Sequence, residues 1–251
     1  MNESNSNFLN QWHISSTQIS TISAHEIHVW RTSLKVSPAR EEQLLALLST
    51  EEHARALRFK FEHHRRRFIV AKGVLRLILA RYIGETPDKI SFALSAHGKP
   101  ELSNPKGYAL QFNSSDSNEM ALYAISLAEP VGVDIESIQK HIEAEAIAER
   151  FFSDHEIKEL SALSPPQKTS AFFNIWTRKE AFIKALGLGL SFPLKDFDVS
   201  SGELAALLAV RNGGYIAEEW SLFNLKPGLD YAGAAAIKGH NKILKLWEFK
   251  E

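Results

Sequence analysis

The sequence predicts a mixed α+β fold built from two halves. Two long helical patterns end alike, at residues 81–84 (RYIG) and 184–187 (KALG), and a strand pattern follows each after a short loop. Glycine just past the last turn is a common helix stop. The chain has 251 residues, which is enough for two small α/β units. We therefore expect one half at residues 26–128 and another at residues 129–251, after a polar tail or arm at residues 1–25.

Composition and charge narrow the class of protein. Apolar residues make up 44% and charged residues 24% of the chain, which is typical of globular proteins. A net charge of −1 argues against a general nucleic-acid binder. The chain has no cysteine, which removes thiolate metal sites and thiol nucleophiles and fits a reducing cytosol. It also has no run of eighteen apolar residues and no signal-like start, so we expect a cytoplasmic protein without a membrane anchor.

The first half begins with a strand and then becomes helical. Alternation predicts the strand, Ser49 offers a cap for the second helix, and a stripe of apolar residues at helical spacing ends at Gly84. The expected helices are 40–48, 51–59 and 65–82, and the expected strands are 26–34, 90–94, 110–113 and 120–127.

The second half follows the same order, with a strand, then helices, then further strands. A strand comes directly after a tight connection at 128–130, and Ser153 with Glu156 three residues later predicts a capping box for the second of three helices. Pro165 and Pro166 are expected to break the chain before the longest helix. The expected helices are 142–152, 153–163 and 168–186, and the expected strands are 131–137, 197–200, 218–225, 231–237 and 243–249.

The longest helix carries charge on its apolar side. At 100° per residue, Phe172, Trp176 and Ile183 fall on one side, and Lys179 lies among them. Charge directed toward an interior is costly unless it is paired or used. We therefore expect this helix to line a cleft.

Two carboxylates share one face of the strand 131–137. Side chains alternate along a strand, so Asp134 and Glu136 point away from the apolar face. They lie roughly 7 Å apart along the strand, close enough to reach one cation. Oxygen ligands suit Mg²⁺. A half-exposed strand with an acidic outer face explains the same pattern without any ligand.

The helix adds the groups that phosphoryl chemistry requires. Glu180 supplies a third carboxylate, and Lys179 and Lys184 supply positive charge beside it. Carboxylates can hold a metal while lysines neutralise phosphate oxygens. Glu180 and Lys184 alone could equally form a surface ion pair worth about 0.2–0.5 kcal/mol.

A basic cluster lies between the second and third helices of the first half. It contains Arg55, Arg58, Lys60 and residues 65–67 (RRR), in a chain that is nearly neutral overall. Such a cluster could face an anionic ligand such as a phosphate-rich cofactor. A solvated helix face is the alternative.

These segments together resemble the 4'-phosphopantetheinyl transferases, in their Sfp type. The resemblance rests on residues 132–136 (GVDIE) followed by 176–184 (WTRKEAFIK), and on 98–100 (GKP), 112–117 (FNSSDS) and 187–191 (GLGLS). It covers the chain from about residue 26 onward. It implies two similar α/β subdomains packed as a pseudo-dimer, which suffices as a monomer, with coenzyme A between them. The implied reaction is Mg²⁺-dependent transfer of phosphopantetheine to a serine of an acyl or peptidyl carrier protein, with release of adenosine 3',5'-bisphosphate.

The resemblance also implies roles for individual residues. Asp134, Glu136 and Glu180 would hold Mg²⁺, Glu180 would act as general base, and Lys179 and Lys184 would neutralise phosphate charge. The implied coenzyme A contacts are Arg55, Arg67, Lys99, Pro100, Ser115 and Asp116.

Asp116 departs from the family pattern, which has histidine there. A carboxylate would repel a phosphate or require a bridging cation or water. This departure supports one alternative, a non-catalytic module that binds carrier protein or coenzyme A. A Mg²⁺-dependent phosphohydrolase is a third option, which would have no special need for the pairing of Lys179 with Lys184.

Overall fold

The computed structural model describes residues 11–14, 21–103, 109–139 and 142–250. Within them the chain forms helices and strands in both halves, as expected for an α+β fold. The helices are α1 (Pro38–Leu45), α2 (Thr50–Leu57), α3 (Glu62–Ile83), α4 (Ala144–Phe151), α5 (Asp154–Ser161) and α6 (Pro165–Leu186).

Two sheets contain most of the strands. The larger has the order β1-β12-β2-β6-β5, and the smaller has the order β10-β11-β7. The strands of the larger sheet are β1 (His13–Ile14), β2 (Glu26–Ser33), β5 (Leu110–Ser117), β6 (Met120–Leu127) and β12 (Ile243–Glu248). Those of the smaller sheet are β7 (Val131–Ser137), β10 (Trp220–Leu225) and β11 (Tyr231–Lys238). Two further pairs are β3 (Phe92–Leu94) with β4 (Pro100–Leu102), and β8 (Phe197–Val199) with β9 (Leu207–Val210).

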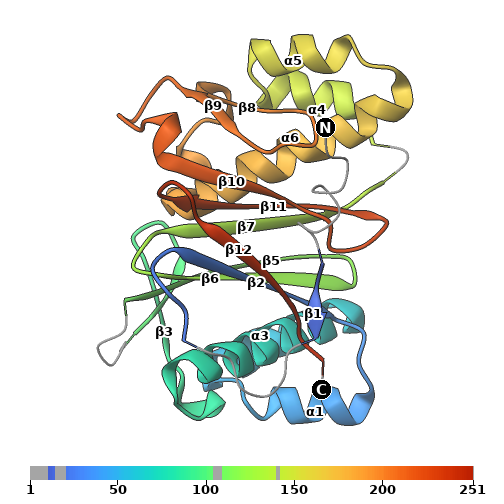
Figure 1. The fold of residues 1–251 in the computed structure, drawn as a ribbon. Coiled ribbons are helices and arrows are strands. Elements are labelled where there is room, and N and C mark those ends of the chain that lie inside the picture. Colours follow the sequence, from blue (N-terminus) through green and yellow to red (C-terminus); the bar gives the residue numbers. More distant parts are fainter. Residues whose placement is uncertain (1–10, 15–20, 104–108, 140–141, 251) are drawn as a thin grey trace.

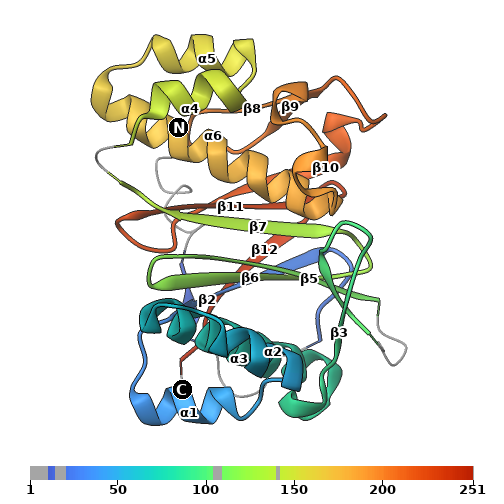
Figure 2. The same ribbon diagram turned by 180° about the vertical axis from the view of Figure 1, so that it is seen from behind.

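The two sheets lie face to face, with one long helix outside each (Figure 1). Helix α3 covers the outer face of the larger sheet and α6 covers the smaller sheet, as the reverse view also shows (Figure 2). Three apolar clusters fill the spaces between these four layers. One lies under α3 around Trp30, a second lies between the sheets around Val133, and the third lies under α6 around Phe182.

Local signals in the sequence place most of these elements correctly. Gly84 and Gly187 end α3 and α6 with φ of 67° and 71°, which L-residues with a Cβ rarely adopt. Capping boxes form at Ser49 and Ser153. The prolines were misjudged: α6 begins at Pro165 because proline is well suited to the first helical turn, where its missing N–H has no partner to lose.

The strand predictions were less complete. Strand β5 continues to Ser117, beyond the expected end at residue 113, and β4 and β9 were not predicted. The last strand, β12, joins the sheet of the first half and runs parallel to β2, with Ile243 opposite Glu26. The division of the chain into halves at residues 128–129 therefore stays a prediction. The final strand belongs to the second half in sequence but to the sheet of the first half in the fold.

Helix α6 packs directly on strand β7 at Gly132. A Cβ at this position would lie 2.0 Å from the carbonyl oxygen of Ala181 and 2.4 Å from the amide nitrogen of Ala185. Ala234 and Ala236 of the neighbouring strand β11 are fully buried in the same cluster and keep the surface under the helix flat. The small side chains thus let the helix backbone approach the sheet, with Asp134 and Glu136 on the same face of β7 as Gly132.

None of the helices in the described residues is both long enough and apolar enough to cross a membrane.

We predict that Gly132→Ala lowers the free energy of unfolding by roughly 3 kcal/mol, because the helix must move away from the strand to admit one methyl group. Gly202→Ala is the matched control, since its Cβ would have no heavy atom within 4 Å. Urea denaturation of both variants measures the difference. Equal urea midpoints for the two variants would show that the contact between α6 and β7 can admit a methyl group at residue 132.

Candidate functional site

The centre of the site is a buried carboxylate bonded to a lysine from the facing helix. The Oδ1 atom of Asp134, on β7, lies 2.6 Å from the Nζ atom of Lys184 on α6. The Oγ atom of Ser115, on β5, lies 2.8 Å from the same oxygen and 2.9 Å from the same nitrogen. Three groups from three elements therefore meet at one point, and one of them comes from the other sheet.

Strand β5 contributes a second serine, two residues farther along. The hydroxyl of Ser117 donates to Glu136 at 3.0 Å and accepts from the backbone N–H of Ser137. Asn113, on the same face of β5, accepts from the N–H of Val133 through its side-chain oxygen. These alternate residues of β5 join the edges of the two sheets without a backbone ladder.

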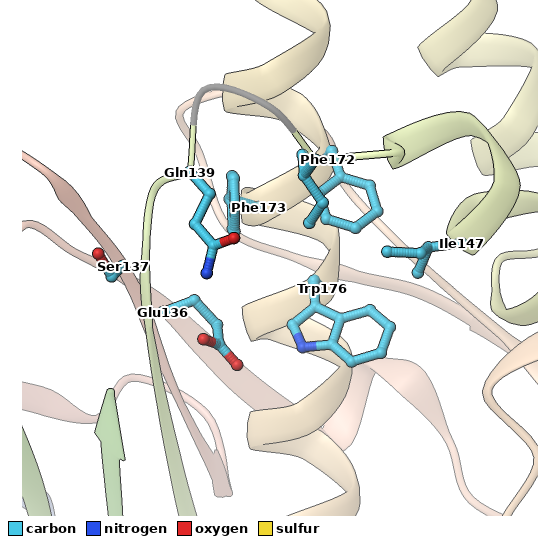
Figure 3. A pocket seen from close by; sticks show the side chains of 8 residues that line it. Glu136, Ser137, Gln139, Ile147, Phe172, Phe173 and Trp176 are labelled. Atoms are coloured by element: carbon cyan, nitrogen blue, oxygen red, sulfur yellow. The ribbon is translucent and has the colours of Figure 1, made fainter. Parts of the chain in front are cut away.

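Glu136 also borders a small aromatic cavity. The cavity has a volume of about 170 Å³ and is lined on the helix side by Phe172, Phe173 and Trp176. Figure 3 shows the carboxylate of Glu136 facing the indole nitrogen of Trp176. Burial and the charge of Asp134 raise the pKa of Glu136, while Ser117, Lys184 and the Trp176 indole lower it in part.

Glu180 is the most perturbed carboxyl group of the three. Burial raises its pKa to about 7, and the charges of Asp134 and Glu136 add to the increase, while Lys184 opposes it. Burial also raises the pKa of Asp134, although Lys184 and Ser115 favour its ionised form. The charge of Asp134 thus raises the pKa of both glutamates, and the charge of Glu136 also raises that of Glu180, which indicates that Glu180 lies within electrostatic range of the other two carboxylates.

The chemistry of these donors suits a hard cation, although no metal site is fully formed. The second oxygen of Asp134, Oδ2, is buried and has no hydrogen-bond partner among the described residues. An unpaired carboxylate oxygen among like charges is where a divalent cation would relieve both desolvation and repulsion. Within the part of the chain that the structure describes, no set of three or more acidic, histidine or cysteine side chains is arranged to hold a metal ion.

Lys179 does not belong to this site, which corrects the prediction that it faces phosphate. Its side chain is fully buried, and its Nζ atom lies 2.8 Å from the carboxylate of Glu156 on α5. The same nitrogen donates to the carbonyl oxygens of Leu194 and Phe197 at 2.7 and 2.6 Å. All three N–H groups are therefore used in the core, and none is left for a ligand.

Lys99 is also engaged elsewhere than predicted. Its ammonium donates to the carbonyl oxygens of Val131 at 3.0 Å and Ala185 at 3.2 Å. Burial lowers its pKa to about 8. Lys99 thus fastens the β3–β4 hairpin to the start of β7 and the end of α6. Two of its three N–H groups are used in this way, and its contact with coenzyme A stays a prediction. Pro100, which begins β4, is partly buried beside it.

The basic residues of the first half lie apart from the carboxylates. Arg55 is exposed on α2, with its guanidinium 5.1 Å from the centre of the Phe68 ring. Arg67, on α3, lies 3.4 Å from the carboxylate of Asp116 on β5. Asp116 therefore has a cation beside it already.

Two partners of the predicted site residues were missed from the sequence. Ser117 could have been noticed, because it shares a strand face with Ser115 once β5 is extended by four residues. Glu156 was recognised only as part of a capping box. Nothing in the local sequence indicates that its carboxylate also reaches a lysine 23 residues away.

Comparison with known proteins identifies the family. Residues 130–236 match the profile of the 4'-phosphopantetheinyl transferase superfamily, and residues 28–128 match that of the N-terminal domain of 4'-phosphopantetheinyl transferases. The 4'-phosphopantetheinyl transferase HetI of Nostoc is 35% identical over 232 residues, which cover 91% of this chain and 94% of that protein. The chain belongs to the 4'-phosphopantetheinyl transferase family.

A second relative is of the type that the sequence motifs predicted. The 4'-phosphopantetheinyl transferase Sfp of Bacillus subtilis is 32% identical over 164 residues, which cover 65% of this chain and 71% of that protein. The prediction of a 4'-phosphopantetheinyl transferase is therefore confirmed, and so is the prediction of an enzyme. The roles of individual residues in this transferase stay predictions.

For the core of the transferase, we predict that Lys179→Met lowers the free energy of unfolding by about 3–5 kcal/mol, because it leaves the Glu156 carboxylate buried without a counter-charge. The double variant Lys179→Met/Glu156→Leu should recover most of this loss, since an apolar pair can replace a buried ion pair. Chemical denaturation measures both, with the exposed Lys158→Met as the control on α5. A single variant as stable as its control would contradict the buried pair.

For the carboxylate cluster, we predict that Glu180→Gln stabilises the fold in metal-free buffer. The folded-state pKa of Glu180 is raised from 4.5 to about 7, so ionisation penalises the folded state increasingly as the pH rises between these values. The gain should be absent below pH ~4.5 and reach on the order of 1–3 kcal/mol above pH ~7.

Thermal unfolding from pH 4 to 8 measures this gain, with the exposed Glu218→Gln as control. A difference that does not change with pH would refute the raised pKa.

Proposed function

We propose that this transferase moves 4'-phosphopantetheine from coenzyme A to a serine of an apo acyl or peptidyl carrier protein. Adenosine 3',5'-bisphosphate is the other product. The observation that carries the proposal is the meeting of Asp134, Glu136, Glu180 and Lys184 between β7 and α6, within a chain of this family. Ser115 of the other sheet completes the cluster.

The proposed chemistry is one displacement at phosphorus. The serine oxygen of the carrier forms a new P–O bond, and the P–O bond to the bridging oxygen of the diphosphate breaks. The serine proton goes to Glu180, which suits a base because its pKa of about 7 lies near neutral pH. Lys184 neutralises charge that develops on the phosphate oxygens, from a position fixed by Asp134 and Ser115.

The residues that would hold Mg²⁺ are Asp134, Glu136 and Glu180. Support comes from the buried, unpaired Oδ2 atom of Asp134 and from the raised pKa values of all three carboxyl groups. When bound, the ion would act as a Lewis acid toward diphosphate oxygens. Of the two lysines of α6 predicted to neutralise phosphate, Lys184 keeps this role in the cluster, since Lys179 is buried against Glu156.

Coenzyme A is proposed to extend from this cluster toward the first half. Arg67 and Ser115 line its path. Asp116, the next residue on β5, is not free, because its carboxylate pairs with Arg67 at 3.4 Å. Arg55 and Pro100 stay predicted contacts of coenzyme A. The pairing of Asp116 with Arg67 supplies the cation that a carboxylate at this position requires, so it does not favour a non-catalytic module.

Some expectations about the whole protein stay predictions from sequence. They are the monomeric state, the cytoplasmic location, and the absence of nucleic-acid and membrane partners.

We predict that an apo-carrier protein incubated with coenzyme A, Mg²⁺ and the transferase gains the mass of one phosphopantetheine. Mass spectrometry of the carrier measures this directly, and EDTA should abolish the gain. Carriers from fatty acid, polyketide and peptide synthesis form the panel. If no carrier of this panel gains mass, the proposed transfer is refuted. Full activity in EDTA would refute the proposed dependence on Mg²⁺.

We predict that Glu180→Gln lowers the transfer rate at least ~100-fold, because the variant loses the proposed base. Unfolding at pH 8 serves as the control for folding, since the variant should be at least as stable as the parent chain. Transfer within about threefold of the parent rate would rule out the role of base, because general-base contributions are typically ~10²–10⁴-fold.

A further inference from the structure

A partly buried lysine lies outside the carboxylate cluster and takes no part in the mechanism above. Lys72, on α3, lines a small pocket of about 60 Å³ between that helix and β5. Ser114, Ser115 and Asp116 form the strand side of the pocket, and Phe68 lies beside Lys72 on the helix side.

Lys72 has no counter-charge in contact. Among the described residues, none forms a hydrogen bond or ion pair with its ammonium group, and burial lowers its pKa. The carboxylates that influence it are Glu52 and Asp116, and each already has another partner. Glu52 bonds to Arg76 at 2.7 Å, and Asp116 pairs with Arg67 at 3.4 Å. A partly buried ammonium without a partner costs stability, and such costs are retained where function requires the group.

The charges around the pocket leave an excess of positive potential. Arg55 and Arg76 both add to the positive field at Lys72, and Arg67 stands on the other side of Asp116. Arg76 neutralises Glu52. Of the two carboxylates that act on Lys72, Asp116 is therefore left to balance the positive charges of Arg55, Arg67 and Lys72. Such a concentration of cations around a pocket favours an anion.

The pocket adjoins the reaction centre. Ser115 lines it and also donates from its hydroxyl to Asp134, while it accepts from Lys184. An anion held beside Lys72 would therefore lie on the α3 side of the edge strand β5, across that strand from the groups proposed to act on the diphosphate.

We propose that Lys72 binds a phosphate group of coenzyme A in the pocket between α3 and β5. Lys72 supplies the positive charge that is missing at Asp116, the position where the family has histidine. The inference rests on the proposed function, which makes coenzyme A the donor. Coenzyme A carries a diphosphate and a ribose phosphate of the same chemistry, and the experiment distinguishes them.

The test compares Lys72→Gln, Lys72→Arg and Lys35→Gln. Lys35 is exposed, so its variant loses the same charge on the open surface. Calorimetry measures the Kd for coenzyme A, and the transfer assay measures KM and kcat separately. Lys72→Gln should weaken coenzyme A roughly tenfold or more, the cost of one charge-assisted hydrogen bond. The loss should fall on KM rather than kcat, and Lys72→Arg should retain most of the affinity.

A merely structural lysine would behave differently in the same samples. Because Lys72 lacks a partner, Lys72→Gln should unfold at the same temperature as the parent chain or higher. Loss of stability together with unchanged affinity would overturn the proposal. A Kd within twofold of the parent value would overturn it as well.

The donor without the ribose phosphate, 3'-dephospho-coenzyme A, identifies the phosphate that Lys72 contacts. If Lys72→Gln weakens coenzyme A but not the dephospho donor, Lys72 contacts the ribose phosphate. If both donors are weakened alike, it contacts the diphosphate.

Failure of the proposed function gives a different result. A parent chain that binds coenzyme A but modifies no carrier refutes the transfer, while the Kd comparison still decides the role of Lys72. A parent chain that does not bind coenzyme A refutes both.

Discussion

The close contact between α6 and β7 at Gly132 is the constraint on which the site depends. With no side chain at this position, the backbone of α6 rests on the strand, and a single Cβ would collide with Ala181 and Ala185. Glu180 and Lys184 flank this contact along the helix, and Asp134 and Glu136 follow it along the strand. The absence of a side chain at one residue thus brings four charged side chains together.

The charges of α6 have two different uses, although they lie within six residues of one another. Lys179 turns toward α5 and is neutralised by Glu156 in the core, where it stabilises the packing of the second half. Glu180 and Lys184 turn toward β7 and stay partly exposed. Desolvation is offset in the first case by a counter-ion and two further hydrogen bonds. In the second it is only partly offset, which leaves perturbed pKa values of the kind that catalytic groups require.

The site also depends on both halves of the chain. Strand β5 lies at the edge of the larger sheet and presents Asn113, Ser115 and Ser117 to strand β7, in alternate positions. Lys99 and the final strand β12 cross between the halves as well. Because these links use side chains and one returning strand, neither half contains the whole site.

Local sequence determined the elements and the alternation of β7, because both follow from short-range backbone and side-chain geometry. Gly84 and Gly187 end helices, Ser49 and Ser153 cap them, and the carboxylates at Asp134 and Glu136 share the face opposite Val133. The family motifs within these elements were therefore readable from the sequence.

Only the tertiary structure decided which charge meets which. A helical projection places Lys179 on the inner side of α6, but it cannot show that the partner of its ammonium group is the carboxylate of Glu156 rather than a phosphate. Likewise, the sequence shows Asp116 only as a departure from the family pattern, and the fold places it beside Arg67. The sequence gives no signal at Lys72, and only the fold shows that it lines a pocket. The physical reason is that the cost of burying a charge depends on partners distant in sequence, and the packing of helices on sheets selects those partners.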